Sequence, residues 1–495
     1  MSTPHLDSPD GRDALRRDLE PWTNDSIAAL IGPRAVAALD REQLVPARLA
    51  CRAAADEPIA LLTRLFALGD TLTVAQLNRA LPALGAGAAA ASGLVATAEL
   101  SDDDQVRALV DLRPYETESH RWWIASDLGE AVTGTRLNDD HVLGVGGASL
   151  TLASITMRTP VGRALDLGTG SGIQALHAST HAQHVTATDI SPRALEFARF
   201  NAELAGTQLD LRHGSLLEPV AGEEFDLIVS NPPFVITPPG APSFEYRDGG
   251  MPGDTLLGSL VRSLGEHLAP GGVAQLLGNW EIRGDWRDRW EQWLDGTELD
   301  AWVVQRDVLD TAQYAEIWLR DAGVVPERGR AAFDAAYEAY LGDFDRRGVR
   351  EIGFGMVLLR RPAGRGPTLH RLEYLEGPVA APLGPTLVET LAAHDRLAAL
   401  TDDELLTHRL TVQSDVTREI FGRPLLPDPE HILIRQGGGF GRAVRANTGL
   451  AGFVGACDGE LTAGQILGAL EALGVEHSQE LIPAIRELVE TGFLA

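Results

Sequence analysis

The chain has 495 residues, 44% of them hydrophobic, and a formal net charge of −28 at pH 7. This length exceeds one ordinary domain, so we expect two to four units with their own cores. The acidic balance disfavours loose, salt-driven attraction to nucleic acid. The sequence contains no lysine, which excludes Schiff-base chemistry and the Gly-Lys-Ser/Thr phosphate loop.

The chain has no segment that predicts a membrane span or a metal site. Residues 1–21 are polar, and the small apolar stretch 83–98 is too short to cross a bilayer, so we expect a cytoplasmic protein that does not bind a membrane. Only two cysteines occur, Cys51 and Cys457, and the histidines lack metal-ligand spacing. We therefore expect neither a disulfide framework nor a metal centre.

The hydrophobic pattern divides the chain into three parts. Residues from about 26 to 115 and from about 376 to 495 show mostly helical periodicity. The middle alternates short apolar strands with helical patterns, which is typical of a parallel α/β sheet. We predict an N-terminal helical domain (1–115), an α/β domain (116–375) and a C-terminal helical domain (376–495).

The two flanks contain a similar segment, at residues 72–81 and 461–470. In each, a Thr that can cap a helix is followed three residues later by Gln, which is the capping-box pattern. An apolar helical segment precedes each, and a helix ending in Gly-Leu-Val or Gly-Phe-Leu follows. This order indicates winged-helix-like domains, which either contact a macromolecular substrate such as nucleic acid or serve in packing and homodimerisation.

The middle part opens with a strand, 161–167, that runs into a glycine loop. Glycines let the backbone approach a ligand, and the helix that follows offers free N–H groups to a carboxylate. This arrangement suits the methionine carboxylate of S-adenosylmethionine, although a nicotinamide site would have a similar loop. The candidate cofactor residues here are Asp166, Gly168, Thr169, Gly170, Ser171 and Gly172.

The next two strands predict the rest of the cofactor site. Strand 184–190 ends in Asp189 and Ile190, and Asp189 can accept both ribose hydroxyl protons or cap the following helix. A third strand ends before Ser215, where the adenine ring would lie. We include Asp189, Ile190 and Ser215 among the cofactor-binding residues.

The strongest catalytic candidate is the run Asn231-Pro232-Pro233-Phe234, directly after the apolar strand 226–230. The Asn231 side-chain oxygen and the Pro232 carbonyl can accept both hydrogens of a planar NH2 group, which turns its lone pair toward a methyl donor. The prolines hold the carbonyl in place, and Phe234 offers a flat face to a planar substrate. An Asn-Pro turn that merely ends a strand is the alternative.

These motifs closely resemble the HemK-like glutamine N-methyltransferases of peptide-chain release factors. The resemblance rests on LDLGTGSGIQAL (165–176), DISPRALEFARFNAEL (189–204), FDLIVSNPPFV (225–235) and the segment 248–272. It implies a Rossmann-like class I core with a seven-stranded sheet, S-adenosylmethionine as cofactor, and Asn231 at the transferred methyl. The chain departs from the family at Ser215, usually acidic, at Phe234, usually Tyr, and in both flanking domains.

Beyond Gly272 we expect the sheet to end in an antiparallel pair, 300–307 or 316–319 with 353–361. Residues 326–347 predict an inserted helix, and six tryptophans between 280 and 318 predict core packing more than a substrate groove. In the C-terminal part, the basic segment 435–445 predicts a glycine hairpin, with a phosphate or RNA grip as the alternative.

The sequence therefore predicts an enzyme, an S-adenosylmethionine-dependent N-methyltransferase. Its acceptor is a protein glutamine, as in release factors, or an amino group of RNA or DNA, and the sequence leaves this choice open. Two other classes stay open: a cofactor-sensing regulator with a silent core, and a small-molecule methyltransferase.

Overall fold

The computed structural model describes residues 3–495 except 7, 98, 241–243, 245–246, 365, 425–428 and 476–477. The chain divides into two compact units. Unit 1 comprises residues 1–152, 160–299 and 308–364, and unit 2 comprises 153–159, 300–307 and 365–495. Among the described residues, no helix has the length and apolar character needed to cross a membrane.

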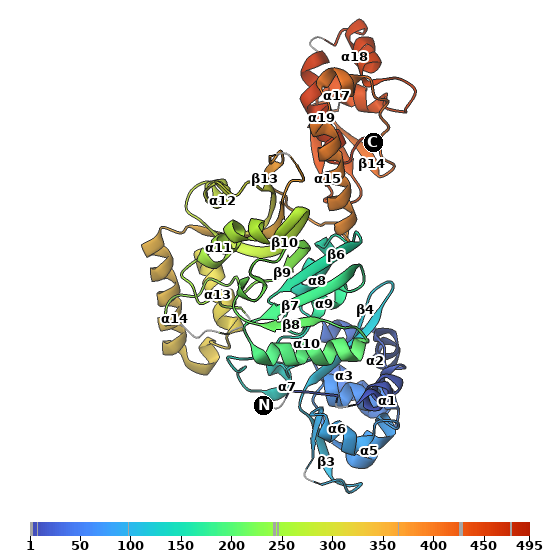
Figure 1. Cartoon of the computed structure of the whole chain (residues 1–495), viewed down its shortest axis with the longest axis vertical. Coiled ribbons are helices and arrows are strands. Elements are labelled where there is room, and N and C mark those ends of the chain that lie inside the picture. The colour runs from blue at the N-terminus through green and yellow to red at the C-terminus, as the bar shows by residue number, and fades with distance from the viewer. Residues whose placement is uncertain are drawn as a thin grey trace. The chain divides into compact units, whose positions relative to one another are not determined.

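The N-terminal part of unit 1 is mostly helical and ends in two small sheets. Its elements are α1 (Pro9–Leu19), α2 (Asn24–Leu39), α3 (Val45–Ala53), α4 (Pro58–Leu62), the π-helical turn η1 (Thr63–Ala67), β1 (Leu72–Thr73), α5 (Val74–Ala80), α6 (Gly85–Ala91), β2 (Val95–Thr97), β3 (Gln105–Ala108), β4 (Asp111–Glu116), β5 (Arg121–Ser126) and α7 (Glu130–Thr133) (Figure 1). Strands β1 to β3 form an antiparallel sheet in the order β1-β3-β2, and β4 pairs with β5.

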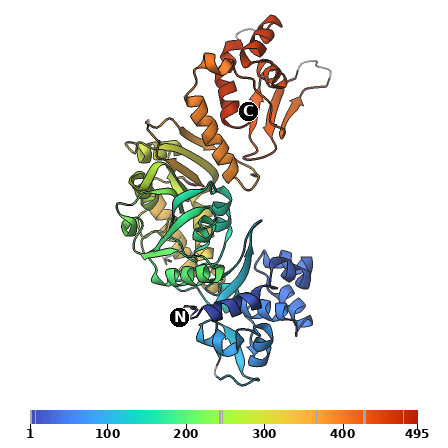
Figure 2. The same cartoon turned by 45° about the vertical axis from the view of Figure 1, so that its right-hand side comes forward.

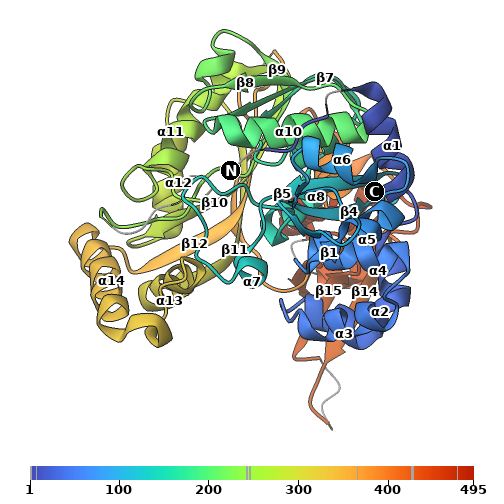
Figure 3. The ribbon, with the colours of Figure 1, turned by 90° about the horizontal axis from the view of Figure 1, so that it is seen from below.

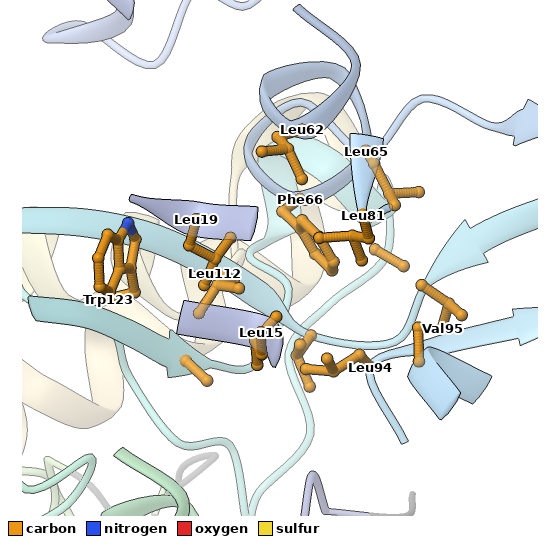
Figure 4. Packing of buried hydrophobic residues seen from close by; sticks show 14 of the residues in the cluster. Leu15, Leu19, Leu62, Leu65, Phe66, Leu81, Leu94, Val95, Leu112 and Trp123 are labelled. Carbon is orange, nitrogen blue, oxygen red and sulfur yellow. The ribbon is translucent and has the colours of Figure 1, made fainter. Parts of the chain in front are cut away.

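A capping box and a buried cluster explain why this part folds. The Thr73 hydroxyl accepts the Gln76 N–H, while the Gln76 side chain accepts the Thr73 N–H, which confirms the predicted capping box. Figure 4 shows side chains from α1, η1 and the strands converging on Phe66, which is fully buried. The Trp22 ring packs 6.3 Å from Phe66, and its Nε1–H donates to Thr63.

The second part of unit 1 is an α/β core. Its elements are α8 (Gly147–Ile155), which continues into unit 2, then β6 (Val161–Leu167), α9 (Ile173–Ala178), β7 (Ala182–Asp189), α10 (Pro192–Ala205), β8 (Asp210–His213), η2 (Glu218–Val220), β9 (Phe225–Ser230), α11 (Thr255–Ser263), η3 (Leu264–His267), β10 (Leu268–Ile282), α12 (Trp286–Leu294), α13 (Thr311–Asp321), α14 (Pro326–Arg347) and β12 (Glu351–Arg360). Helix α10 lies across β7 and β8 (Figure 3).

The sheet of unit 1 runs in the order β12-β10-β9-β6-β7-β8. Strands β6 to β10 pair in parallel, and β12 pairs antiparallel to β10. This is the predicted α/β arrangement; the expected count of seven strands is not confirmed. The alternative that placed a strand at 316–319 is wrong, because these residues lie within α13, whereas the inserted helix predicted at 326–347 is α14.

The core tryptophans pack as predicted. Trp280, Trp290 and Trp293 are almost fully buried, and their rings meet edge to face at centroid distances of 5.1 and 5.0 Å. Trp318 is only partly buried. Because successive residues of a strand face opposite sides, Trp280 packs against α12 on one face of β10 while Asn279 faces α13 on the other.

Unit 2 combines a helical layer with a three-stranded sheet (Figure 2). Its elements are residues 300–307 of β11 (Asp300–Asp310), β13 (His370–Tyr374), α15 (Gly384–Ala398), α16 (Asp402–Leu406), β14 (Val416–Phe421), β15 (His431–Gln436), β16 (Ala443–Ala446), α17 (Thr448–Gly455), α18 (Ala463–Ala472), η4 (Ser478–Leu481) and α19 (Ile482–Glu490). The second capping box, Thr462 with Gln465, is present, and 437–442 joins β15 to β16 as the predicted hairpin.

Replacing Phe66 by Ala tests the N-terminal core. We expect unit 1 to lose about 3–5 kcal/mol of unfolding free energy, because the change leaves a cavity in a fully buried cluster. The matched control is Leu49→Ala, at a side chain that is 62% exposed, with an expected change within about 0.5 kcal/mol. Urea unfolding followed by tryptophan fluorescence measures both, and equal midpoints for the two variants would contradict the assigned packing.

Candidate functional site

The glycine loop leaves β6 with open space above its backbone. Gly168 and Gly170 have φ angles of +74° and +54°, and a Cβ at either position would meet no atom within 4 Å. At Gly172, φ is +88° and a Cβ would lie 3.1 Å from Ala198 of α10. The first two glycines therefore leave room for a ligand, while the third allows close packing of the loop on α10.

Asp166 holds the glycine loop from its buried side. One of its carboxylate oxygens accepts the Thr169 hydroxyl at 2.6 Å and the Ala175 N–H at 2.9 Å, so it ties the loop to the first turn of α9. The side chain is 1% exposed, and burial raises the pKa of Asp166 to about 7. Asp166 thus shapes the cofactor loop from the interior.

Asp189 ends β7 beside the loop. Its carboxylate accepts the Gly170 N–H at 2.8 Å and the Ser191 N–H at 2.9 Å, so it orders the loop and holds Ser191, the N-cap residue of α10. A carboxylate at this strand end is the group that the sequence predicts for the ribose hydroxyls. The neighbouring Ile190 is 58% exposed and presents an apolar surface.

The third strand reaches the same edge of the sheet. The Gly214 N–H donates to the Asp189 carbonyl at 3.0 Å, and the His213 ring contacts the Ile190 carbonyl at 2.9 Å. These bonds place the partly buried Ser215 next to the end of β7. The three predicted cofactor positions Asp189, Ile190 and Ser215 are therefore neighbours in space.

Asn231 follows the strand that pairs directly with β6. Ser230 lies opposite Leu167 in the register, and its hydroxyl donates to the Leu167 carbonyl at 2.7 Å. The next residues along the two strands, Asn231 and Gly168, therefore emerge side by side. The Asn231 side-chain oxygen is buried and accepts no hydrogen bond from any described residue.

The residues after Phe234 are held by groups that the sequence did not indicate. The Val235 N–H donates to the Arg247 carbonyl at 2.9 Å, and the Ile236 N–H donates to the Tyr314 hydroxyl at 2.8 Å. Tyr314 belongs to α13, which together with α14 is inserted between β11 and β12. Nothing in the local sequence pattern marked it, because its partner lies 78 residues away.

Another unanticipated residue, Asn201 of α10, supports the cofactor loop from behind. It is fully buried, accepts the Ala125 N–H at 2.8 Å, and donates to the carbonyls of Ala125 and Ser171 at 2.9 and 2.8 Å. One amide thus joins strand β5 of the N-terminal part to the glycine loop. Nothing in its neighbourhood in the sequence marked it, because its partners lie 76 and 30 residues away.

Two segments of the chain match models of known protein families. Residues 145–241 match the model of the methyltransferase small domain. Residues 20–109 match a domain of unknown function (DUF7059). The first match covers the glycine loop, Asp189 and the Asn231 motif.

The relatives that match are glutamine methyltransferases. The chain is 39% identical over 119 residues to a release factor glutamine methyltransferase of Geobacter sulfurreducens, covering 22% of this chain and 42% of the relative. It is 37% identical over 149 residues to a ribosomal protein uL3 glutamine methyltransferase of Bradyrhizobium diazoefficiens, covering 28% and 46%. The release factor glutamine methyltransferase of Koribacter versatilis is 39% identical over 154 residues, covering 29% and 53%.

The chain thus spans about half the length of these relatives. The core is a HemK-like class I methyltransferase domain, and S-adenosylmethionine is its cofactor. The open space at Gly168 and Gly170, with the Asp189 carboxylate beside the loop, fits this cofactor.

Asp166 should make the stability of the cofactor-free protein depend on pH. Between the ordinary pKa of 3.8 and the folded-state pKa of about 7, the folded protein holds a proton that the unfolded chain has lost. The free energy of unfolding therefore falls as pH rises through this window. Above the window, the penalty for burying the ionised Asp166 carboxylate no longer changes with pH. Asp166→Asn lacks this penalty, so its melting temperature relative to the wild type should rise from pH 4 to 7. A constant difference across that range would contradict the buried, proton-binding Asp166.

Substitutions at Asp189 and at Asn231 should have different effects on the affinity for the cofactor. We expect Asp189→Asn to weaken S-adenosylmethionine binding about 10- to 100-fold, because it removes a charged acceptor worth about 1.5–3 kcal/mol. Asn231→Ala should bind the cofactor within about threefold of the wild type. Isothermal titration calorimetry measures both, and similar losses for the two variants would show that the site is assigned wrongly.

Proposed function

We propose that the protein is an S-adenosylmethionine-dependent N-methyltransferase whose acceptor is a glutamine side chain of a protein. The observation that carries the proposal is the buried Asn231 oxygen at the edge where β6 and β9 end, to which no residue that the structure describes donates a hydrogen bond. A buried acceptor without a donor is costly, so its retention favours a ligand that supplies one. A carboxamide NH2 group supplies this donor.

The chain's own residues account for the chemistry. The side-chain oxygen of Asn231 and the carbonyl of Pro232 accept the two N–H groups of the target amide, so its nitrogen moves toward a tetrahedral form and its lone pair leaves conjugation with the carbonyl. S-adenosylmethionine supplies the activated methyl group when bound. Holding the nitrogen in line with the methyl group provides the remaining acceleration, because orientation alone can lower the activation free energy by about 7–11 kcal/mol. The nitrogen gains the methyl group as the methyl–sulfonium bond breaks and leaves a thioether, and it gives up one N–H proton to solvent.

The acceptor class follows from the relatives and from charge. The relatives are named as glutamine methyltransferases of a release factor and a ribosomal protein. In unit 2, Arg435 is paired with Glu419 and Arg442 with Glu373, so these two cations of the glycine hairpin are neutralised. Together with the net charge of −28, this pairing disfavours RNA or DNA as acceptor.

We also propose that both flanks are winged-helix-like domains that contact the acceptor or a second copy of the chain. The support in the N-terminal part is the element order helix, strand, helix, helix, strand, strand with the sheet order β1-β3-β2. In the C-terminal part it is α17, α18 and α19 with bridges from Thr411 to Asp458 and from Val412 to Leu494. The three-domain division and the cytoplasmic location stay predictions.

Methyl transfer from labelled S-adenosylmethionine into a cell extract tests the function. We expect label in a protein fraction that protease removes and nuclease does not, and recovery of N5-methylglutamine after proteolysis. Asn231→Ala should lower transfer by more than about 100-fold, because the amide loses its acceptor while the cofactor still binds.

Each other outcome has a definite meaning. Label that only nuclease removes would replace glutamine by a base amine as acceptor. Equal labelling by the wild type and Asn231→Ala would overturn the mechanism. No macromolecular label at all would favour a small-molecule acceptor or a cofactor-sensing regulator.

A further inference from the structure

The segment that follows Phe234 leaves the sheet and meets the two inserted helices, α13 and α14, which lie together in Figure 3. Tyr314 of α13 is fully buried, and its hydroxyl lies 2.8 Å from the Ile236 nitrogen and 2.8 Å from the side-chain nitrogen of Asn279. Ile236 itself is 1% exposed. The Tyr314 hydroxyl is therefore the acceptor for a buried main-chain N–H five residues after Asn231.

The bond from the Ile236 N–H to the Tyr314 hydroxyl is present in either orientation of the Asn279 side-chain amide. A phenol has one proton to donate, and with two N–H donors it would have no acceptor for that proton. Turning the Asn279 amide over lets its oxygen accept the phenol proton, and such amide orientations are assigned rather than observed. In both orientations the main-chain N–H of Ile236 can only donate, so it still needs the Tyr314 oxygen.

Two more contacts join the inserted helices to the same segment. Asp321, at the end of α13, pairs with Arg247 at 2.6 Å, and the Arg247 carbonyl accepts the Val235 N–H. The Tyr340 hydroxyl of α14 lies 3.5 Å from the Thr237 hydroxyl. Arg247 is 4% exposed and the Asp321 side chain is 45% exposed, so the pair joins a buried guanidinium to a carboxylate at the surface. Residues 235–237 are thus held at three consecutive positions from one side.

Apolar packing alone does not explain these contacts. A phenylalanine at position 314 would keep the ring contacts with Phe344 and Phe354, which lie 5.8 Å away. Only the hydroxyl satisfies the Ile236 N–H, and a buried N–H without an acceptor favours an altered local backbone. The role of the hydroxyl is therefore to fix the course of the chain just after the catalytic motif.

We propose that Tyr314 is a positioning residue of the methyltransferase site: through Ile236, the inserted helices hold the Asn231-Pro232-Pro233-Phe234 segment in the geometry that receives the acceptor amide. The effect on methyl transfer rests on the proposed function. The effect on the backbone of residues 234–236 does not.

The test compares Tyr314→Phe with Tyr337→Phe in the full chain. Tyr337 is the control, because its hydroxyl also bonds the main chain, here as a donor to the Ala312 carbonyl at 2.8 Å, and it makes no hydrogen bond to residues 231–237 among the described contacts. Hydrogen-exchange mass spectrometry of peptides covering 234–236 should show exchange about tenfold or more faster in Tyr314→Phe and unchanged in Tyr337→Phe. Affinity for S-adenosylmethionine should stay within about twofold in both variants, since the glycine loop is supported separately.

Methyl transfer provides the second measurement. Tyr314→Phe should lower kcat about tenfold with little change in the KM for the cofactor, whereas a merely structural role would lower the melting temperature and leave the kcat of the folded fraction unchanged. Unchanged exchange at 234–236 in Tyr314→Phe would overturn the proposal. Faster exchange together with no methyl transfer by the wild type would uphold the positioning role and reject the proposed function.

A second variant keeps the test decisive if Tyr314→Phe does not fold. Asp321→Asn changes a side chain that is 45% exposed and removes one of the two charges that pair with Arg247, whose carbonyl accepts the Val235 N–H. Arg247 keeps its pairing with Asp248 and its bond to the Trp318 carbonyl. The same peptides should exchange faster in Asp321→Asn than in the wild type. If exchange is unchanged in that folded variant, the inserted helices do not position the segment.

Discussion

The parallel pairing of β6 with β9 is the constraint on which the site depends. Ser230 lies opposite Leu167 and donates its hydroxyl to the Leu167 carbonyl, so the two strands end at the same level. Because parallel strands present their carboxyl ends at one edge of a sheet, the glycine loop and Asn231 emerge together there. A shift of one residue in this register would turn Asn231 to the other face of the sheet and separate the amide acceptor from the cofactor loop.

Buried polar side chains then hold the loops that the strands deliver. Asp166 ties the glycine loop to α9 from inside the core, and Asn201 joins the same loop to strand β5 of the N-terminal part. On the other side, Tyr314 and Asp321 hold the segment after the catalytic motif. Each of these groups is almost fully buried or pairs with a group that is. Because water does not reach the buried groups, the protein itself supplies their hydrogen-bond partners. The cofactor loop and the acceptor segment therefore have separate supports, which is why we expect their variants to affect binding and transfer differently.

Sequence reasoning identified the local features and missed the distant ones. Both capping boxes, at Thr73 and Thr462, are present because Thr and Gln three residues apart interact within one helical turn. The inserted helix has the predicted bounds, 326–347, since Pro begins it and Gly348 ends it in a left-handed conformation. By contrast, residues 316–319 form part of an amphipathic helix rather than a strand, because α13 buries Tyr314, Ala315 and Leu319 at helical spacing. Tyr314, Asn201 and Arg247 carry no signal in their own neighbourhoods that points to the site.

The sequence by itself determined the local patterns on which the proposed chemistry rests: a glycine loop, an acidic strand end and Asn231 before two prolines, which depend on residue type and short spacing. The tertiary structure alone decided how that chemistry is held. The Asn231 oxygen has no donor among the described residues, Ile236 is bonded to a tyrosine 78 residues away, and Asn201 joins segments 76 and 30 residues distant. Packing between segments that are distant in the chain satisfies buried polar groups in ways that leave no periodic trace along the sequence.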